Sequence, residues 1–538
     1  MGCTFCPHSR TPFVPRSRLI FVIRFLLAQL YLTALEDRTT VKAVKKALSQ
    51  FKKQAQEAST QETKAEMLAS AYDQAMERIH SQREGFRQLA QRVLTWITTA
   101  TRPLSATELQ HALAVELGER SLDTDNISSI DLLASVCSGL VAVDKESNVV
   151  RLIHYTTQEY FNCTRDRWFP SAEAELCATC VTYLSFDAFS SGFSESYTQY
   201  KERLKLYPLY EYSAHNWAIH ARNASWDSSS NPLMEATKPM LDFLERDANV
   251  ETAMQVVSID LRDPARVATS KTPRKTTGLH FVARQGLDNA LIALLKRGHN
   301  PDPQDSHGRT PLSYAAQQGH LSTARILLAC PEVDAEKADS IQGKSPLMFA
   351  TQLENEAMAN LFLSLAQDRV DINRQDANGR TLLLWAAATR RWDLFLRLLD
   401  KHQADPTIPD KFGQTALALA AEAGETAIVV RLLAIESVDV DSTDICGLTP
   451  YLLAYVSGGE EVKEAFNGRL GLKTPGEICL PQWGVEKRLL KQIRGLNFDL
   501  PSNVLPVRCR DFNVVSVPLI SSTLLQSGKR SMLILSCP

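Results

Sequence analysis

Hydrophobic residues recur at positions i, i+3, i+4 and i+7 through most of the first 125 residues. This period predicts four helices, over FLLAQLYLTAL (25–35), VKAVKKALSQFKKQ (41–54), AEMLASAYDQAMERIHSQ (65–82) and GFRQLAQRVLTWITTA (85–100). Arg102-Pro103-Leu104 then breaks the pattern. Ser105 and Glu108 occupy the capping-box positions of a further helix, SATELQHALAVEL.

The hydrophobic pattern changes after residue 137. IDLLASVC (130–137) reads as a short helix, and two β-rich runs then flank the polar turn Asp144–Asn148, which predicts a hairpin. Helices followed by a two-stranded hairpin are typical of a winged-helix domain, which we expect over 85–165.

The run VVRLIHYTTQEYF (149–161) combines the end of this hairpin with a cluster of polar side chains. We expect Thr156 or Thr157 to cap the next helix, and Tyr160 and Phe161 to pack inward. His154 and Glu159 resemble an acid–base pair, but no nucleophile or phosphate loop accompanies them. We therefore interpret both as hydrogen-bonded structural residues.

The second half of the chain repeats with a period of about 34 residues. The typical copy has a turn glycine, a hydroxyl two residues later, a small residue five after the hydroxyl, and a hydrophobic pair at seventeen and eighteen after it; the first copy has Lys275 at the glycine position. The glycines are Gly308, Gly343, Gly379, Gly413 and Gly447, and the hydroxyls are Thr277, Thr310, Ser345, Thr381, Thr415 and Thr449. Glycine suits a turn with positive φ, and a hydroxyl suits a helix N-cap.

These segments resemble ankyrin repeats, with five good copies and a degenerate sixth within 272–467. In the sixth, Tyr451 replaces the usual Leu and Phe466–Asn467 replaces the Leu pair. The expected fold class is therefore mainly α, a helical and winged-helix module followed by an ankyrin-repeat solenoid. Beyond the winged helix, the expected parts are a start without regular pattern (1–18), a helical region (19–84), a helical connector (166–271) and an unassigned tail (468–538).

Ankyrin arrays bind protein ligands through their hairpin tips and the exposed face of the first helix of each repeat. The resemblance carries this role to thirteen positions of this chain: Ser306, His307, Arg309, Gln317, Gln318, Ile341, Gln342, Lys344, Asn378, Arg380, Lys411, Phe412 and Gln414. An aromatic column four residues after the hydroxyl (Phe281, Tyr314, Phe349 and Trp385) is either a peptide-binding stripe or packing between repeats, and we favour packing.

Residues 25–220 resemble the region that follows the nucleotidase in fungal NACHT-type (NLR-like) ankyrin-repeat proteins. FLLAQLYL, LTWITTATRPLSATELQHALAVE, SSIDLLASVCSGLVAVD, VVRLIHYTTQEYF and TCVTYLSFDAFSSGF carry this resemblance. In such chains the winged helix is likened to that of GPI inositol deacylase, without its hydrolase activity. The resemblance implies a P-loop ATPase upstream of FLLAQLYL, so the chain is expected to be such a receptor's regulatory and recognition part without its ATPase.

Composition narrows the possible partners. A formal net charge of −2 and 44% hydrophobic residues are ordinary for a folded soluble chain, and eleven scattered cysteines suggest reduced thiols, hence a cytoplasmic location. Residues 275–467 hold 18 Lys/Arg against 25 Asp/Glu, which disfavours nucleic acid and suggests a basic protein partner. Arg24 interrupts the apolar run LIFVIRFLLAQLYL, so we expect a buried helix there and no membrane contact.

Other candidate chemistry is weak. Gly343-Lys344-Ser345 lies in phase with the repeat turns, with Ala338 where a P-loop needs its first glycine. Cys177 and Cys180 start an apolar helix without a second pair at zinc spacing, and the candidate recognition helix 127–137 has no Lys or Arg. We expect no catalytic residues, metal or cofactor.

The leading hypothesis is therefore a non-enzymatic protein-interaction and signalling protein that binds a protein ligand and acts with a separate NACHT ATPase. The alternative is an NTPase- or hydrolase-related fragment with a degenerate site.

Overall fold

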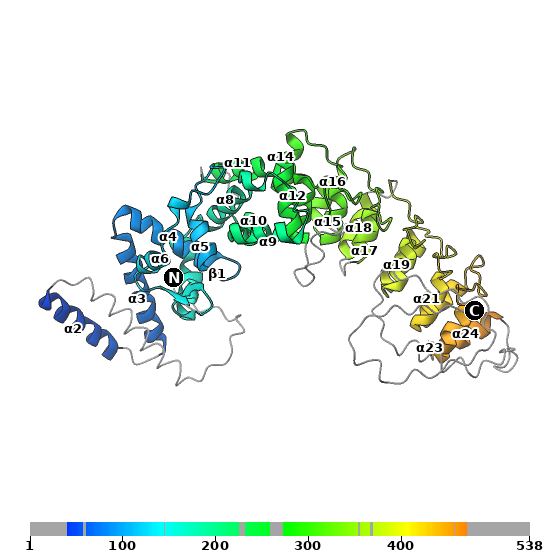
Figure 1. Cartoon of the computed structure of the whole chain (residues 1–538). Helices are drawn as coiled ribbons and strands as arrows, with labels where there is room; N and C mark the ends of the chain where they lie inside the picture. Colours follow the sequence, from blue (N-terminus) through cyan, green and yellow to red (C-terminus); the bar gives the residue numbers. More distant parts are fainter. Residues whose placement is uncertain are drawn as a thin grey trace, which may run out of the picture. The chain divides into compact units, whose positions relative to one another are not determined.

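The computed structural model describes residues 40–57, 61–144, 146–224, 232–258, 273–352, 356–365, 369–457 and 459–470. Within these ranges the protein is mainly helical, as predicted. The chain divides into two compact units between Val370 and Asp371, and each is described by itself (Figure 1). The predicted helix 25–35, the start 1–18 and residues 471–538 of the predicted tail lie outside the described residues.

The first unit begins with helices and a small sheet. Its elements up to the connector are α2 (Val41–Glu57), α3 (Gln61–His80), α4 (Glu84–Thr99), β1 (Leu104–Ser105), α5 (Ala106–Ala114), the 3₁₀ turn η1 (Thr124–Asn126), α6 (Ile130–Ser135), β2 (Val141–Asp144) and β3 (Val149–Leu152). The predicted helices 41–54, 65–82 and 85–100 are confirmed, as is the hairpin. Asp144 stabilises the hairpin turn by accepting from the N–H groups of Glu146 and Ser147.

The start of α5 combines a predicted cap with an unpredicted strand. Ser105 Oγ accepts from Glu108 N (3.2 Å), while Glu108 Oε2 accepts from Ser105 N (2.7 Å), which confirms the capping box. Leu104 and Ser105 also pair with Val150 and Val149 of β3. The sheet therefore has three strands in the order β1-β3-β2, and the segment predicted to be only a chain break is its third strand.

The next helix, α7 (Tyr155–Trp168), begins differently from the prediction. Its N-cap is His154, whose Nδ1 accepts from Thr156 N at 3.3 Å, so the expectation of a threonine cap is wrong. The Thr156 and Thr157 hydroxyls instead lie 2.8 and 3.1 Å from the Tyr72 hydroxyl on α3. Tyr160 and Phe161 are buried, as predicted.

Glu159 also differs from its predicted role. Its carboxylate makes no hydrogen bond with any described residue, and its partial burial raises its pKa. Among the described residues, the expected hydrogen bond is thus found for His154 and not for Glu159.

A helical connector joins the winged helix to the repeats within the first unit. It comprises α8 (Ala172–Leu184), η2 (Asp187–Phe189), α9 (Tyr197–Leu206), α10 (Leu209–Asn223), α11 (Pro232–Leu244) and α12 (Asp247–Ser258). The rings of Trp217, Phe243 and Phe281 pack with centroids 5.4 to 6.4 Å apart and are almost fully buried. One aromatic core therefore joins α10 and α11 to the first helix of the first repeat.

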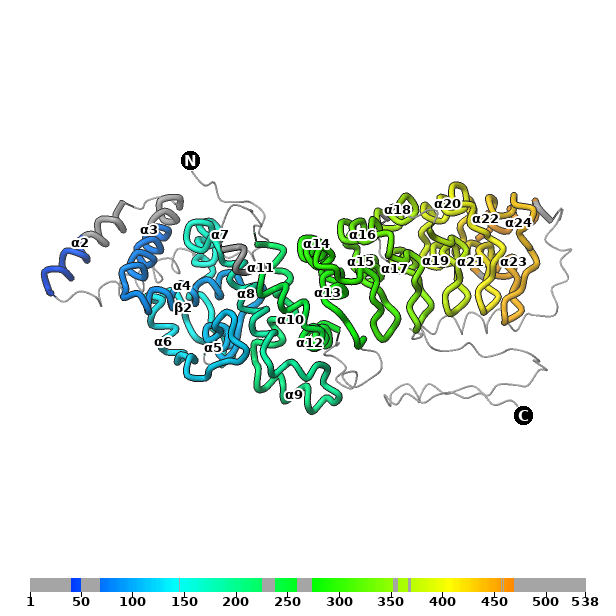
Figure 2. The backbone as a smooth tube through the Cα atoms, turned by 90° about the horizontal axis from the view of Figure 1, so that it is seen from above, coloured from blue at the N-terminus to red at the C-terminus, as the bar shows by residue number. Residues whose placement is uncertain are grey.

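The repeats are successive pairs of helices. In the first unit they are α13 (Gly278–Gln285) with α14 (Asp288–Lys296), α15 (Pro311–Gln318) with α16 (Leu321–Leu328), and α17 (Pro346–Gln352) with α18 (Glu356–Leu365). In the second unit they are α19 (Leu382–Ala388) with α20 (Trp392–Lys401), α21 (Ala416–Ala423) with α22 (Thr426–Leu433), and α23 (Pro450–Ser457) with α24 (Glu460–Leu470). Within each unit, the loops between repeats extend to one side of the helix pairs (Figure 2).

The repeat columns have the structural roles that the sequence predicts. The five turn glycines have φ between 63° and 76°. Thr310, Thr381 and Thr415 each accept from the backbone N–H three residues later at the start of a helix. In the degenerate sixth repeat, Tyr451 packs edge-on against the buried ring of Phe466, with centroids 5.8 Å apart.

Candidate protein-binding surface

Each hairpin turn is built around an aspartate. Oδ1 of Asp305 accepts from the N–H groups of His307 (2.8 Å) and Arg309 (2.9 Å), which closes the turn at Gly308. The equivalent residues of the later repeats are Asp339, Asp376, Asp410 and Asp444, and each also accepts from two backbone N–H groups. This column is absent from the predictions above, although an aspartate stands three or four residues before every turn glycine.

Backbone hydrogen bonds join neighbouring hairpins within each unit. In the first unit, Ser306 N donates to Arg274 O (2.8 Å) and Ser340 N donates to His307 O (2.7 Å). In the second unit, Lys411 N donates to Asn378 O (2.8 Å) and Ile445 N donates to Phe412 O (2.9 Å). Because both the turn and its neighbour are fixed, the residues at the tips are held in place before any ligand arrives.

The thirteen predicted surface positions differ in exposure. Ser306, Gln318, Ile341 and Lys411 are exposed, whereas Arg309, Gln317, Gln342, Asn378, Arg380, Phe412 and Gln414 are partly buried. His307 and Lys344 are only 7% and 5% exposed. The expectation of solvent-facing side chains is therefore wrong for these two residues.

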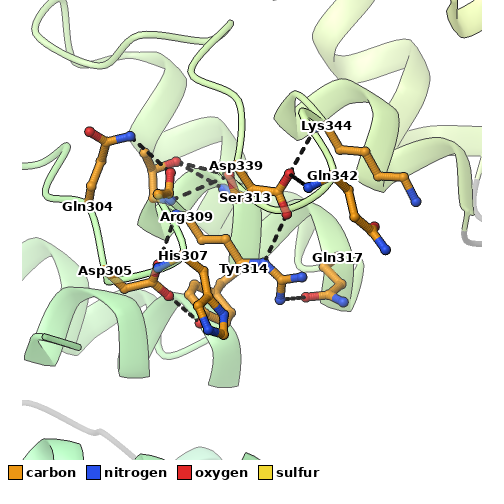
Figure 3. Close-up of polar contacts among 12 residues, drawn as sticks. Gln304, Asp305, His307, Arg309, Ser313, Tyr314, Gln317, Asp339, Gln342 and Lys344 are labelled. Atoms are coloured by element: carbon orange, nitrogen blue, oxygen red, sulfur yellow. Dashed lines mark hydrogen bonds and ion pairs between the residues drawn. The ribbon is translucent and has the colours of Figure 1, made fainter. Parts of the chain in front are cut away.

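The position after the turn glycine explains part of this difference. Arg309, in the same column as Lys344, turns inward so that its guanidinium lies 5.0 Å from the ring centroid of Phe349. Its Nε is 3.6 Å from Oδ2 of Asp339, and its Nη1 donates to Gln317 Oε1 at 3.4 Å (Figure 3). Residues after the glycine therefore connect a hairpin to the next repeat as well as bordering the surface.

The second unit repeats this construction. Arg380 Nε donates to Asp410 Oδ2 (3.3 Å), and its guanidinium lies 5.5 Å from the ring centroid of Trp385. Nε1 of Trp385 donates to Asp376 Oδ2 at 3.0 Å. Arg309 also lies 6.0 Å from the ring centroid of Tyr314, so in each unit an arginine lies between the aspartate of the next hairpin and the aromatic ring of its own repeat.

The aromatic column packs inside the repeats. Phe281, Tyr314 and Phe349 are at most 2% exposed, which confirms packing and excludes a peptide-binding stripe at these three positions. Trp385 is partly buried.

Two further surface residues follow from the repeat register and are absent from the thirteen predicted positions. Arg284 and Gln285 lie seven and eight residues after Thr277, in the positions of Gln317 and Gln318 one repeat later. Both are partly exposed at the end of α13. Burial lowers the pKa of the Arg284 guanidinium, and the positive charge of Arg309 lowers it further.

The cysteine pair of α8 and the Gly343-Lys344-Ser345 segment, both considered above as possible chemical sites, belong to structural parts of the fold. Cys177 and Cys180 are buried in α8, and burial raises the pKa of the Cys180 thiol to about 12, so it is protonated at neutral pH. Gly343 is the positive-φ residue of a repeat turn, and Ser345 Oγ accepts from Met348 N at the start of α17. The described residues contain no group of three His, Cys, Asp or Glu arranged to hold a metal ion. No described helix has the length and apolar composition required to cross a bilayer.

Comparison with known families identifies the two kinds of domain. Residues 76–187 match the winged helix domain of GPI inositol-deacylase, and residues 254–339 and 279–376 match ankyrin repeats. The chain is 30% identical to human Rabankyrin-5 over 158 residues, 29% of this chain and 13% of that protein. It is 32% identical to human neurogenic locus notch homolog protein 1 over 172 residues, 32% of this chain and 6% of that protein. The matched stretches thus span only a small part of these relatives.

Solved structures of ankyrin repeat domains match about a third of the chain. The ankyrin repeat domain of Bcl-3 is 24% identical, with a TM-score of 0.32 over 36% of this chain and 82% of that chain. An ankyrin repeat domain from Acinetobacter baumannii is 22% identical, with a TM-score of 0.32 over 36% of this chain and 96% of that chain. By its family matches, the protein combines a winged helix domain like that of GPI inositol-deacylase with ankyrin repeats.

Proposed function

We propose that this protein is a non-enzymatic interaction protein that binds a protein ligand through the hairpin tips and first-helix faces of its ankyrin repeats. The observation that carries the proposal is the set of exposed tip side chains, such as Ser306, Ile341 and Lys411, on hairpins fixed by backbone hydrogen bonds. A prearranged surface loses little conformational entropy when it binds.

The winged helix gives this binding surface a role in signalling. We propose that it serves the recognition part of a NACHT–ankyrin (NLR-like) receptor in the cytoplasm and acts with a separate NACHT ATPase. The proposal draws on the resemblance of residues 25–220 and on the joint presence of a deacylase-like winged helix and ankyrin repeats. The aromatic contact from Trp217 to Phe281 supports it, because it offers a packed route between the first repeat and the connector.

Comparative enrichment from an extract of the source cells tests the binding function. The full chain is compared with a tip variant, Ser306→Arg with Ile341→Asp, and with a matched variant on second helices, Ser322→Arg with Ile292→Asp. Ser322 and Ile292 are exposed on α16 and α14 of the same unit. We expect quantitative mass spectrometry to show a partner that is lost from the tip variant and retained by the matched variant. Equal retention by both variants would reject the proposed surface.

A thermal-shift assay separates this function from the alternative of an NTPase- or hydrolase-related fragment. The proposal predicts the same melting temperature with and without ATP and magnesium. A rise in melting temperature that requires both would favour a nucleotide site.

A further inference from the structure

Two arginines lie beside one buried tyrosine at the ends of the first two repeats. The Arg284 and Arg309 guanidinium carbons are each 6.0 Å from the ring centroid of Tyr314. Arg284 comes from the last turn of α13, and Arg309 follows the hairpin glycine of the second repeat. The pair therefore brings two positive charges to the first-helix side of the first unit.

These two arginines differ in how their charge is balanced. Arg309 faces the Asp339 carboxylate at 3.6 Å. Arg284 donates to the backbone carbonyl of Val257 (3.2 Å), and no described carboxylate lies within ion-pair distance of it. The charge of Arg284 is thus unneutralised by the described residues, although its side chain is partly buried.

Two aspartates of the first two repeats, Asp305 and Asp288, are already used by the fold. Asp305 accepts from two backbone N–H groups and from the Tyr314 hydroxyl, and Asp288 accepts from the Thr323 hydroxyl at 2.6 Å. Arg222 and His320 lie on the same end of α13, where they bond to the carbonyl groups of Gln285 and Arg284. Arg222 therefore adds a positive charge near Arg284, whereas burial lowers the pKa of His320 and favours its neutral form.

Gln317 adds a side-chain amide donor next to Arg309. Gln317 Oε1 accepts from Arg309, so the NH₂ group of Gln317 remains a donor, and the exposed Gln318 follows it in α15. A fork of arginine donors with a neighbouring amide suits a carboxylate, which accepts hydrogen bonds through both oxygens.

We propose that Arg284, supported by Arg309 and Gln317, binds a carboxylate side chain in an acidic peptide segment of the protein ligand. This rests on the proposed function and names the chemistry of the ligand. It reverses the expectation of a basic partner, which came from the net charge of residues 275–467, because local charge decides what a surface binds. A nucleic acid fits less well, since phosphate binding requires many basic contacts and this segment is acidic overall.

Fluorescence anisotropy with the full chain tests this inference. The probes are a labelled peptide of alternating Glu and Ser, matched peptides with Gln or Lys in place of Glu, and a single-stranded DNA of equal charge. The proteins are the wild type, Arg284→Gln, Arg284→Lys, Gln318→Glu and the control Arg325→Gln on α16. Circular dichroism melting confirms that each variant is folded, and the exposed Gln318 supplies a variant that leaves the buried contacts intact.

We expect the Glu peptide to bind more tightly than the Gln and Lys peptides. Arg284→Gln should weaken it about tenfold, Gln318→Glu about threefold, and Arg284→Lys less than Arg284→Gln, as for partly desolvated charge contacts. Arg325→Gln should bind as the wild type does.

The inference is overturned if the Glu peptide binds no better than the Gln peptide, if Arg284→Gln and Arg325→Gln bind it equally, or if DNA binds more tightly with the same dependence on Arg284. In each case a partner that depends on Ser306 and Ile341 in the enrichment experiment would leave the proposed function standing.

Discussion

The hydroxyl of Tyr314 donates a 2.7 Å hydrogen bond to Oδ2 of Asp305, so a buried side chain of α15 holds the turn of its own hairpin. Oδ1 of the same aspartate accepts the two backbone N–H groups that form the turn. In the second unit, Trp385 makes the equivalent contact with Asp376. The aromatic column therefore stabilises the hairpins as well as filling the space between helices.

Removing the Tyr314 hydroxyl should loosen its hairpin. Tyr314→Phe leaves one buried oxygen of Asp305 without a donor, which costs about 1–3 kcal/mol. We expect a lower urea midpoint and faster amide exchange over residues 305–310. Unchanged exchange at this hairpin would show that the hydroxyl does not hold the turn.

In the third repeat the equivalent hydroxyl can be added instead of removed. Phe349 occupies the aromatic column without a polar group, and Oδ2 of the buried Asp339 accepts no hydrogen bond, while Arg309 Nε lies 3.6 Å from it as an ion-pair partner. Phe349→Tyr should supply the missing donor and raise the free energy of unfolding by about 1 kcal/mol. Calorimetry or urea unfolding measures this gain. A loss of stability would mean that the ring is positioned differently from that of Tyr314.

Alanine substitutions at two glycines of the second unit distinguish the cost of a positive φ from the cost of steric crowding. Gly413 and Gly424 have nearly equal φ values, +74° and +78°. A Cβ at Gly413 would lie 2.9 Å from Thr443 O, whereas one at Gly424 would meet nothing within 4 Å. Gly424→Ala should cost about 1 kcal/mol from left-handed strain alone, and Gly413→Ala should cost clearly more. Equal losses in urea unfolding would contradict the close approach of neighbouring hairpins.

Acidification should destabilise the first repeat through His280. Burial is the main cause of the lowered pKa of this imidazole, and the nearby Asp305 only partly offsets it. Its Nδ1 accepts from Thr277 N, and its Nε2 faces Arg309 O at 3.1 Å, so the folded state favours the neutral ring. Below its unfolded pKa of about 6.5, the unfolded chain binds a proton that the folded chain does not, and stability falls as pH decreases.

The measurement for His280 is the urea midpoint at pH 7.5 and pH 5.5. We expect His280→Gln to show a smaller loss between these pH values than the wild type, after circular dichroism has shown that it is folded at pH 7.5. An identical loss in both proteins would assign the pH dependence to other groups.

Features that depend on local sequence were predictable. The Ser105–Glu108 capping box, the hairpin around Asp144–Asn148 and the turn glycines each follow from residues a few positions apart, and all are present in the structure. Features that depend on distant contacts were missed. β1 is two residues long, too short to show an alternating pattern, and it exists because Leu104 and Ser105 pair with β3.

In the candidate surface, too, local features were predictable from the sequence and distant contacts were not. The alignment of the repeats placed His307 and Lys344 among the surface positions, yet both side chains are buried. Such an alignment gives the position of a residue in the hairpin but not the direction of its side chain. His154 was passed over as a cap because threonine is normally the better one, while Tyr72, 84 residues from Thr156, recruits the threonine hydroxyls. Arg284 could have been found by extending the column of Gln317 one repeat earlier.

Site-specific photocrosslinking tests the central claim, that the hairpin and first-helix side of the repeats binds the ligand. A photoreactive amino acid is placed in the full chain at Gln318 on α15 or at Arg325 on α16, both exposed and within one repeat. The chain is then crosslinked to the partner recovered by enrichment. We predict a crosslink from position 318 and none from position 325. A crosslink from position 325 alone would place the ligand on the second helices and contradict the account.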